Sequence, residues 1–202
     1  NKVTSTDADS EAGLGGGIYV VADGTIFRNV TADNNAAKNG GGAYIKGDNV
    51  IVDNCTLSNN KAIYNENNVN GSGLGGALDI AGDGCYINNT HSNNNTAYRG
   101  GSTFIRGSNV TVQNCNLDNN SAEIRGGALN IGGGDNCKVI NVSVSNNHAS
   151  EEGGAVYVVG NNTFFDNVNS TNNYAMYGGS SYVAGNNVTV QNCNLDNNTE
   201  IG

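Results

Sequence analysis

Cations are scarce in this sequence. Its 202 residues include nine Lys and Arg against eighteen Asp and Glu, a formal net charge of −9, with two His, one Met and no Pro or Trp. Because phosphate binding needs clustered cations, the scattered positive charges argue against a nucleic-acid partner. No apolar run approaches the roughly 18 residues of a membrane-spanning helix, so no membrane insertion is expected in this segment.

Glycine and asparagine are abundant instead. The chain has 30 Gly and 40 Asn, while apolar residues make up 37%. The apolar residues come in short alternating runs such as NVTVQ at Asn109–Gln113. This alternation is the period of a β-strand, and Gly and Asn clusters between the runs indicate turns. The sequence therefore predicts an all-β chain, long enough for one domain with a real core.

One unit recurs seven times. A glycine pair opens each copy, and the pairs begin at Gly15, Gly40, Gly75, Gly100, Gly126, Gly153 and Gly178. The second copy is longer because of an insertion near Ile63–Gly73. We interpret residues 15–202 as the repeats and residues 1–14 as the end of a preceding coil or an N-terminal cap. With no initiator Met and no signal peptide, we expect a processed chain or a segment of a longer array.

The copies agree column by column. A β-branched column, Val20, Ile45, Ile80, Ile105, Ile131, Val158 and Val183, is expected to point inward. An unbroken Asn column is expected to form a buried amide ladder, and its members are Asn29, Asn54, Asn89, Asn114, Asn141, Asn167 and Asn192. The Asn-Asn pairs that follow five residues later are interpreted as ordinary turns.

A period near 25 residues with short strand and turn pieces fits one coil of a parallel β-helix. Each strand would pair with its equivalent in the next coil, about 4.8 Å along the axis. About seven coils of roughly 25 residues would give a rod roughly 30 Å long with a continuous apolar interior.

The repeat resembles that of a known family. Copies of GGA-x-Y-V followed by N-x-T-x-x-N-C-x-x-x-N-N-x-A resemble the repeats of adhesin-like surface proteins of methanogenic archaea. They are also similar to the repeats of chlamydial polymorphic outer-membrane proteins, with GGAV at Gly153–Val156 and FRN at Phe27–Asn29 as the nearest matches. The resemblance implies a single-stranded, right-handed, pectate-lyase-like solenoid displayed outside a cell.

Five cysteines fall into two columns. Cys55, Cys115 and Cys193 share one, and Cys85 and Cys137 share the other. Members of one column lie two or more coils apart, about 9.6 Å or more, which is too far for a disulfide. We therefore expect buried free thiols and no disulfides. No CxxC spacing indicates a zinc site.

No active site is evident from the columns, and no cofactor is expected. His91 and His148 fall in different columns two coils apart. Asp33, Asp118 and Asp196 are spaced along one column rather than paired, whereas polysaccharide-cleaving sites need clustered carboxylates. Calcium at Asp23-Gly24 or Asp83-Gly84 stays an alternative to a plain turn.

A further column alternates with two inward positions and so should face outward. Its members are Tyr19, Tyr44, Asp79, Phe104, Asn130, Tyr157 and Tyr182. One interpretation is an aromatic ladder that only stiffens the sheet. The other is a binding platform for sugar rings, formed by Tyr19, Tyr44, Phe104, Tyr157 and Tyr182. The variable loops before each glycine pair are a second candidate binding region.

Twelve N-x-S/T sequons occur. The glycosylation candidates are Asn70, Asn94, Asn109, Asn119 and Asn187, with Asn70 favoured because it lies in the insertion. Asn29, Asn54 and Asn141 are expected to be too buried to carry a glycan.

These observations predict an extracellular, cell-surface solenoid that is not an enzyme and attaches to carbohydrate or another cell. One alternative is a structural protein whose copies stack end to end into a filament or sheath, because no polar cap is evident at either end. A second alternative is a degenerate polysaccharide lyase or hydrolase.

Overall fold

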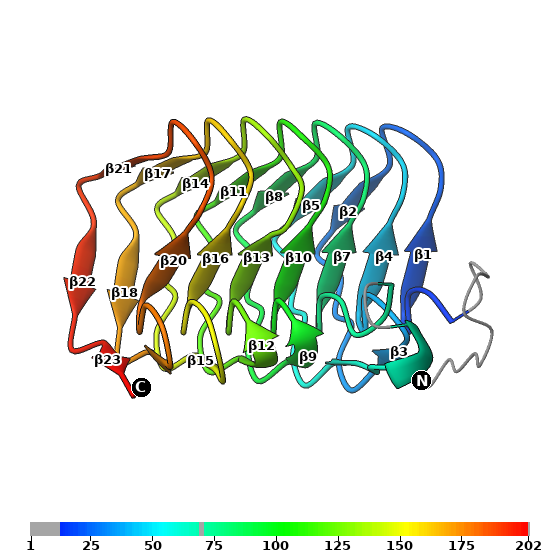
Figure 1. The fold of residues 1–202 in the computed structure, drawn as a ribbon. Helices are drawn as coiled ribbons and strands as arrows, with labels where there is room; N and C mark the ends of the chain where they lie inside the picture. The colour runs from blue at the N-terminus through cyan, green and yellow to red at the C-terminus, as the bar shows by residue number, and fades with distance from the viewer. Residues whose placement is uncertain (1–12, 69–70, 202) are drawn as a thin grey trace.

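The chain folds into a parallel β-helix. The structure is a computed structural model that describes residues 13–68 and 71–201. Three seven-stranded parallel sheets run along the rod, and the coils follow one another from the blue to the red end (Figure 1). The predicted fold class is confirmed, whereas the interpretation of residues 1–14 falls mostly outside the described residues.

Equivalent strands of successive coils make up each sheet. The first sheet contains β1 (Ile18–Val20), β4 (Ala43–Ile45), β7 (Leu78–Ile80), β10 (Thr103–Ile105), β13 (Leu129–Ile131), β16 (Val156–Val158) and β20 (Ser181–Val183). The second contains β2 (Ile26–Arg28), β5 (Ile51–Asp53), β8 (Tyr86–Asn88), β11 (Thr111–Gln113), β14 (Lys138–Ile140), β17 (Phe164–Asp166) and β21 (Thr189–Gln191). The third contains β3 (Ala36–Ala37), β6 (Lys61–Ala62), β9 (Thr96–Arg99), β12 (Ser121–Arg125), β15 (His148–Ala149), β19 (Tyr174–Ala175) and β23 (Thr199–Glu200).

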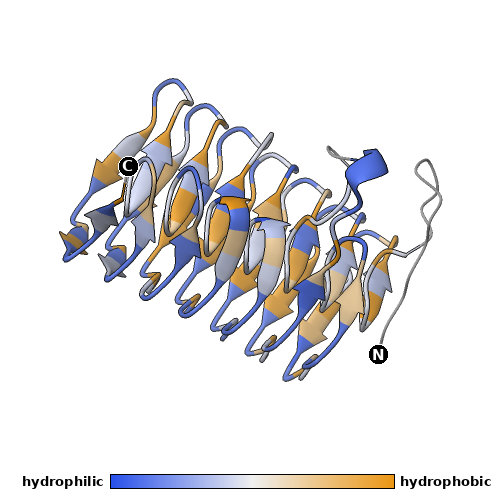
Figure 2. Ribbon diagram, turned by 60° about the horizontal axis from the view of Figure 1, so that its bottom comes forward, coloured by the Kyte–Doolittle hydropathy of each residue, from blue (hydrophilic) through white to orange (hydrophobic). Residues whose placement is uncertain are grey.

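Three short elements lie outside these sheets. Strands β18 (Asn169–Thr171) and β22 (Asn194–Asp196) pair with each other, and a 3-10 helix, η1 (Glu66–Asn68), lies in the insertion. In Figure 2 apolar residues gather on the strands and polar residues on the turns, as the alternating pattern predicts.

The interior is a stack of identical columns. Ile45 of β4 pairs in register with Ile80 of β7, and Ile105 pairs with Ile131. All four side chains are fully buried. Burying one such side chain stabilises the fold by about 1.5–3 kcal/mol, and the repeat provides the same gain in each interior coil. The β-branched column therefore points inward, as predicted.

The glycine pair meets two different steric demands. Gly40 has a φ of +58°, and a Cβ there would lie 2.2 Å from the carbonyl oxygen of Ala43. Gly41 has ordinary φ, but a Cβ would lie 2.3 Å from the carbonyl oxygen of Gly76 in the next coil. The first glycine thus permits the left-handed turn, and the second lets two backbones approach.

The predicted Asn column forms turns, so the expectation that it is buried was wrong. All seven members have positive φ, and their side chains lie at the surface. Amide contacts still join Asn54 to Asn29 at 2.7 Å and Asn167 to Asn141 at 2.8 Å. Every described non-glycine residue with positive φ is an Asn, because its short amide tolerates this conformation.

The buried ladder is the second Asn of each Asn-Asn pair. The buried members are Asn35, Asn60, Asn95, Asn120, Asn147 and Asn173, and the half-buried Asn198 continues the column in the last coil. In each of the first six of these residues the backbone N–H donates to the side-chain Oδ1 of the next, for example from Asn60 to Asn95 at 2.8 Å. The first Asn of each pair has positive φ, so only this half of the pair is the ordinary turn that the sequence predicted.

Candidate functional site

The aromatic column lies on the outer surface of the first sheet but is mostly covered. Tyr44, Phe104 and Tyr157 are 9% exposed or less, and only Tyr19, at 39%, is clearly open. Two pairs of rings are in contact, Tyr19 with Tyr44 edge-on and Tyr157 stacked on Tyr182, each at a centroid distance of 5.5 Å. Their faces are therefore largely occupied, which favours the stiffening ladder over the sugar platform.

Two arginines cover this column further. The Arg106 guanidinium lies 5.5 Å from the Tyr44 ring centroid, and Arg125 lies 5.1 Å from that of Tyr157. Arg125 also pairs with Glu152. Cation–π contacts of this kind add stability to the outer surface of the sheet.

Arg106 links two other coils. It donates to the fully buried Asp79 carboxylate at 2.7 Å and to the Tyr44 hydroxyl at 3.0 Å. The other carboxylate oxygen, Oδ1, has no hydrogen-bond partner. Burial raises the pKa of Asp79 to about 6 despite the opposing charge of Arg106. With its carboxylate sealed from solvent, Asp79 is a structural rather than a ligand-facing group.

The remaining acidic columns satisfy backbone donors. Asp23 Oδ1 accepts from the Asp48 N–H at 2.8 Å, and Asp48 Oδ1 accepts from the Asp83 N–H at 2.8 Å. Asp33 and Asp118 do the same for Ser58 and Ser145. Among residues 13–68 and 71–201, no three His, Cys, Asp or Glu side chains gather closely enough to hold a metal ion.

A row of exposed or half-buried polar and aromatic residues follows the outer surface of the third sheet. We call this row the lateral track, and its members in chain order are Lys61, Thr96, Ser121, His148 and Tyr174. The Ser121 Oγ lies 3.4 Å from His148 Nδ1, and the His148 ring stacks on Tyr174 at 4.2 Å. Burial against these neighbours lowers the pKa of His148.

The two ends of the lateral track differ. At one end a cavity of about 240 Å³ is lined by Lys61, Thr96, Ser121 and Glu123. At the other end Tyr174 and Tyr177 are 42% and 52% exposed and lie beside the exposed Met176. The track therefore combines a polar cavity with open aromatic surface.

The insertion is tied to the rod near the cavity. Tyr64 stacks on Tyr98 with ring centroids 3.8 Å apart, and the Tyr98 N–H donates to the Gly73 carbonyl at 2.8 Å. Inside the loop, the Ser72 hydroxyl bonds the carbonyls of Asn65 and Asn68. Tyr64 of the insertion thus packs on Tyr98 at this edge of the rod, and the Arg99 guanidinium lies 5.6 Å from the Tyr98 ring centroid.

The remaining predicted residues are distributed along the rod. Asn94, Asn109, Asn119 and Asn187 lie at exposed turns with positive φ, while Asn70 lies outside the described residues. Asn29, Asn54 and Asn141 are exposed as well, so the expectation that burial excludes them from glycosylation was wrong. His91 bridges to Thr56 and Asn116, in a different column from His148.

The cysteines are free thiols. Cys55, Cys85, Cys115 and Cys137 are buried, and Cys193 is half-buried at the last coil. Burial raises the pKa of Cys115 and Cys137 to about 11. These thiols pack as small apolar groups in the core.

Sequence reasoning missed the lateral track. Its column contains Ala36, Lys61, Thr96, Ser121, His148, Tyr174 and Thr199, which share no chemistry. The available signal was the variation itself, in the column that leads into the variable loops.

No protein-family model, curated protein or solved structure matches this chain. No helix among the described residues has the length and apolar character needed to span a membrane.

Proposed function

We propose that this chain is an extracellular, adhesin-like β-solenoid that attaches to carbohydrate through the lateral track. The observation that carries the proposal is the arrangement of Lys61, Thr96, Ser121, His148 and Tyr174 in one register-matched line. Neighbouring members are one coil, or about 4.8 Å, apart. An extended sugar chain lying along the rod would meet a new side chain with about every sugar unit.

The chemistry of the track suits sugars. Thr96 and Ser121 offer hydroxyls, and Lys61 and Glu123 offer a donor and an acceptor around the same cavity. Tyr174 and Tyr177 offer open ring surface, and an exposed apolar group of this kind on a polar rod is typical of an interaction site. A cavity of about 240 Å³ is small, which suits a single sugar ring better than a larger compact ligand.

A non-enzymatic role is supported by how the acidic groups are used. Asp23, Asp33 and Asp118 accept backbone N–H groups, and Asp79 is sealed beneath Arg106. The proposed role is therefore to present a binding line on a rigid rod at a cell surface.

The test is a glycan array probed with the purified chain, followed by titration of the best ligand. Tyr174→Ser and Glu123→Gln should each weaken binding by about tenfold or more, because each removes a ligand-facing group. Tyr19→Ser is the matched control, since Tyr19 is also exposed but lies on the first sheet. Loss of binding with Tyr19→Ser but not with Tyr174→Ser would move the site to the first sheet. Unchanged binding in all three variants would refute both locations.

A further inference from the structure

Two tyrosines meet where the insertion leaves the rod. Tyr64 lies two residues beyond β6, and Tyr98 lies inside β9 of the next coil. Their rings are nearly parallel, with an interplanar angle of 13° and centroids 3.8 Å apart. Hydrogen bonding to the Tyr98 hydroxyl raises the pKa of Tyr64, so the two hydroxyls lie on the same side of the stack. The ring carbons beside the two hydroxyls therefore face each other at van der Waals distance.

Gly73 makes room for this pair. It has a φ of +72°, and a Cβ there would lie 2.5 Å from Tyr98 Cβ and 3.2 Å from Tyr64 Cβ. The Tyr98 N–H donates to the Gly73 carbonyl at 2.8 Å, which fixes the backbone at this place. Only glycine combines the left-handed backbone with so close an approach. The returning end of the insertion is thus packed directly against both tyrosines.

Two other tyrosine pairs are in contact, and their geometry is different. Tyr19 and Tyr44 meet edge-on, with an interplanar angle of 64° and centroids 5.5 Å apart. Tyr157 and Tyr182 are parallel, but their centroids are also 5.5 Å apart. Both pairs occupy equivalent positions of neighbouring strands, so the strand spacing of about 4.8 Å keeps their rings apart. Tyr64 is not held by this spacing, because it lies in the insertion rather than in a sheet.

We propose that Tyr64 and Tyr98 form a dityrosine cross-link when the chain is oxidised. The oxidant is hydrogen peroxide activated by a peroxidase, which removes one electron and one proton from each phenol. The two radicals couple through the ring carbons beside their hydroxyls, and a carbon–carbon bond forms. Each ring becomes aromatic again when the hydrogen on its bonded carbon moves to its own oxygen. In total the chain loses two hydrogen atoms, and one peroxide molecule becomes two water molecules.

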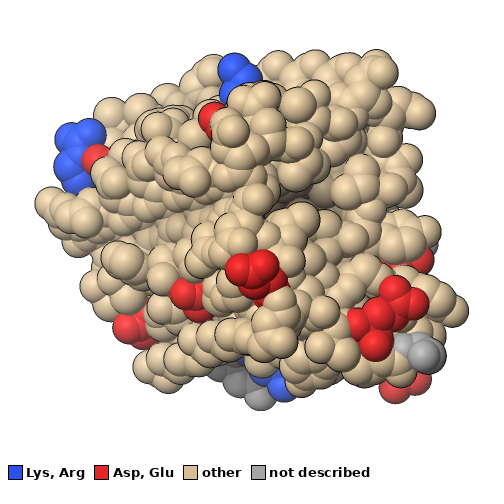
Figure 3. All heavy atoms as spheres, turned by 90° about the vertical axis from the view of Figure 1, so that its left-hand side faces the viewer, with Lys and Arg blue, Asp and Glu red and all other residues tan. Residues whose placement is uncertain are grey.

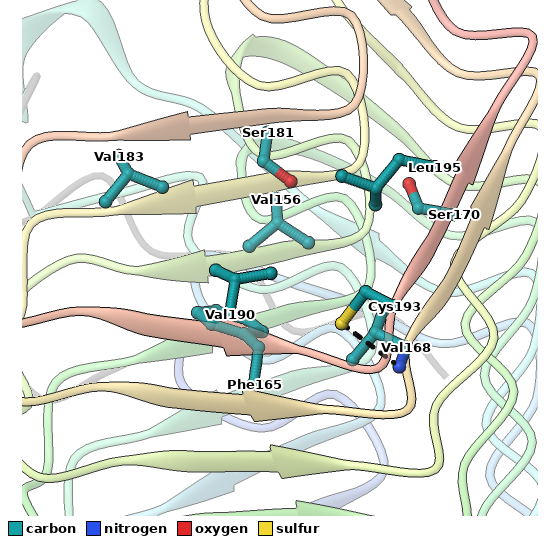
Figure 4. A pocket seen from close by; sticks show the side chains of 9 residues that line it. All are labelled: Val156, Phe165, Val168, Ser170, Ser181, Val183, Val190, Cys193 and Leu195. Carbon is teal, nitrogen blue, oxygen red and sulfur yellow. Dashed lines mark hydrogen bonds between the residues drawn. The ribbon is translucent and has the colours of Figure 1, made fainter.

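The composition of the chain favours oxidation at tyrosine. The sequence has nine Tyr, one Met and no Trp, so the tyrosines are its most easily oxidised rings. Four of the five cysteines are buried. The fifth, Cys193, accepts the Val168 N–H at 3.4 Å (Figure 4). Oxidation of a thiol to its acids adds oxygen instead of removing hydrogen, so mass distinguishes the two reactions.

The charge of the chain favours a link within one molecule. Copies with a net charge of −9 repel one another, and acidic groups are spread over the end of the rod that Figure 3 shows. The stacked pair, in contrast, holds its two reacting carbons together before oxidation. Such positioning raises the rate of coupling far above that between separate molecules.

The cross-link would fasten the insertion beside the cavity of the lateral track. Tyr98 is two residues beyond Thr96, which lines that cavity. A covalent bond from Tyr64 to Tyr98 also closes a long loop of the chain, and this restricts the unfolded state as a disulfide does. The modification is independent of what the lateral track binds.

The test treats the native chain at low concentration with a peroxidase and hydrogen peroxide, after accessible thiols have been blocked with iodoacetamide. We expect a monomer lighter by two hydrogen atoms, the blue fluorescence of dityrosine, and a cross-linked peptide that joins Tyr64 to Tyr98. A native chain without intramolecular dityrosine, in a solution where free tyrosine couples, would overturn the proposal. A cross-link between Tyr157 and Tyr182 in its place would do the same.

Three variants test whether the geometry causes the reaction. Tyr98→Phe keeps the stacked ring but removes one phenol, so it should lower the yield of intramolecular dityrosine by about tenfold or more. Tyr157→Phe makes the same change in the other parallel pair and should couple like the native chain. Gly73→Ala keeps every phenol, and its Cβ should push the rings apart and lower the yield. Equal yields from Tyr98→Phe and Tyr157→Phe would refute the assignment; circular dichroism checks that each variant is folded.

Discussion

Asn95 places two donors on a single acceptor, the side-chain Oδ1 of Asn120 in the next coil. Its backbone N–H lies 2.9 Å from that oxygen and its side-chain amide 3.0 Å. The Asn120 amide in turn donates to the Ser92 carbonyl at 2.9 Å. The buried Asn120 side chain therefore satisfies three groups, the two Asn95 donors and the Ser92 carbonyl. Its loss would leave them unpaired.

Replacing Asn120 with glycine should be far more costly than the same change at Asn114. Each buried group left unsatisfied costs about 1–3 kcal/mol, so Asn120→Gly should destabilise by about 3 kcal/mol or more. Asn114 is exposed with a φ of 53°, a conformation that glycine adopts freely, so Asn114→Gly should stay within about 0.5 kcal/mol of the native chain. Urea unfolding of both variants provides the measurement. Equal losses would contradict the assignment of the two columns.

Removing Arg106 should expose the cost of burying Asp79. Arg106→Met leaves the carboxylate without its cation, and breaking a buried pair in this way typically costs about 3–5 kcal/mol. The double variant Asp79→Asn/Arg106→Met should recover much of that loss because no charge remains buried. Thermal unfolding at pH 7.5 compares the three chains, and a double variant no more stable than the single one would count against this explanation.

The same carboxyl should make stability depend on pH. Burial raises its pKa from 3.8 to about 6, so between these values the folded chain binds more protons than the unfolded chain. The contribution of Asp79 is thus fully present below about pH 3.8 and is lost as pH rises through about 6. A rise in pKa from 3.8 to about 6 corresponds to about 3 kcal/mol. Unfolding free energies of the native chain and Asp79→Asn, measured from pH 4 to 7.5, should diverge by that order, and parallel curves would contradict the prediction.

The aromatic column should matter for stability rather than for binding. Tyr157 is stacked on Tyr182 and covered by Arg125, so Tyr157→Ser should destabilise by about 3 kcal/mol. Binding to the glycan found for the lateral track should not change. Tyr19→Ser, at an open position of the same column, should cost clearly less in the same melting experiment. Weakened binding with little loss of stability would restore the platform interpretation.

Thiol labelling should separate one cysteine from the other four. Cys193 is the only described cysteine that is not fully buried, and it lies on the open face of the last coil. Under native conditions it should react with iodoacetamide well before the buried thiols, since reaction needs access and thiolate character. Peptide mapping by mass spectrometry reads the order, and early labelling of Cys115 would be inconsistent with the packing.

The architecture could be predicted because its demands recur at fixed positions. Gly40 and Gly41 are needed at the corner of a coil, and Ile45 is needed inside it. Every coil therefore has a glycine pair and a β-branched residue at the equivalent positions. Residue identity alone could not separate Asn114 from Asn120, because both columns are unbroken. The Asn114 column needs asparagine for its left-handed backbone, and the Asn120 column needs it for the hydrogen-bonded ladder. Only the fold distinguishes these causes.

Burial of the aromatic column could not be predicted from strand alternation. Alternation places Tyr44 outside the core, but Arg106 reaches it from two coils away and covers it. A long side chain that crosses between coils leaves no signature in a column. The lateral track could not be predicted for the opposite reason, because its members share a position in the coil without sharing chemistry.

The twelve residues Asn109–Asn120 recur unchanged at Asn187–Asn198, although their neighbours above and below differ. Each coil contacts chiefly the coil before it and the coil after it, so a unit carries its own means of being stacked. Removing residues 100–125 would join Arg99 to Gly126 at equivalent points of the corner and shorten the rod by about 4.8 Å. The number of coils therefore sets the length of the rod, and that length can be changed one coil at a time.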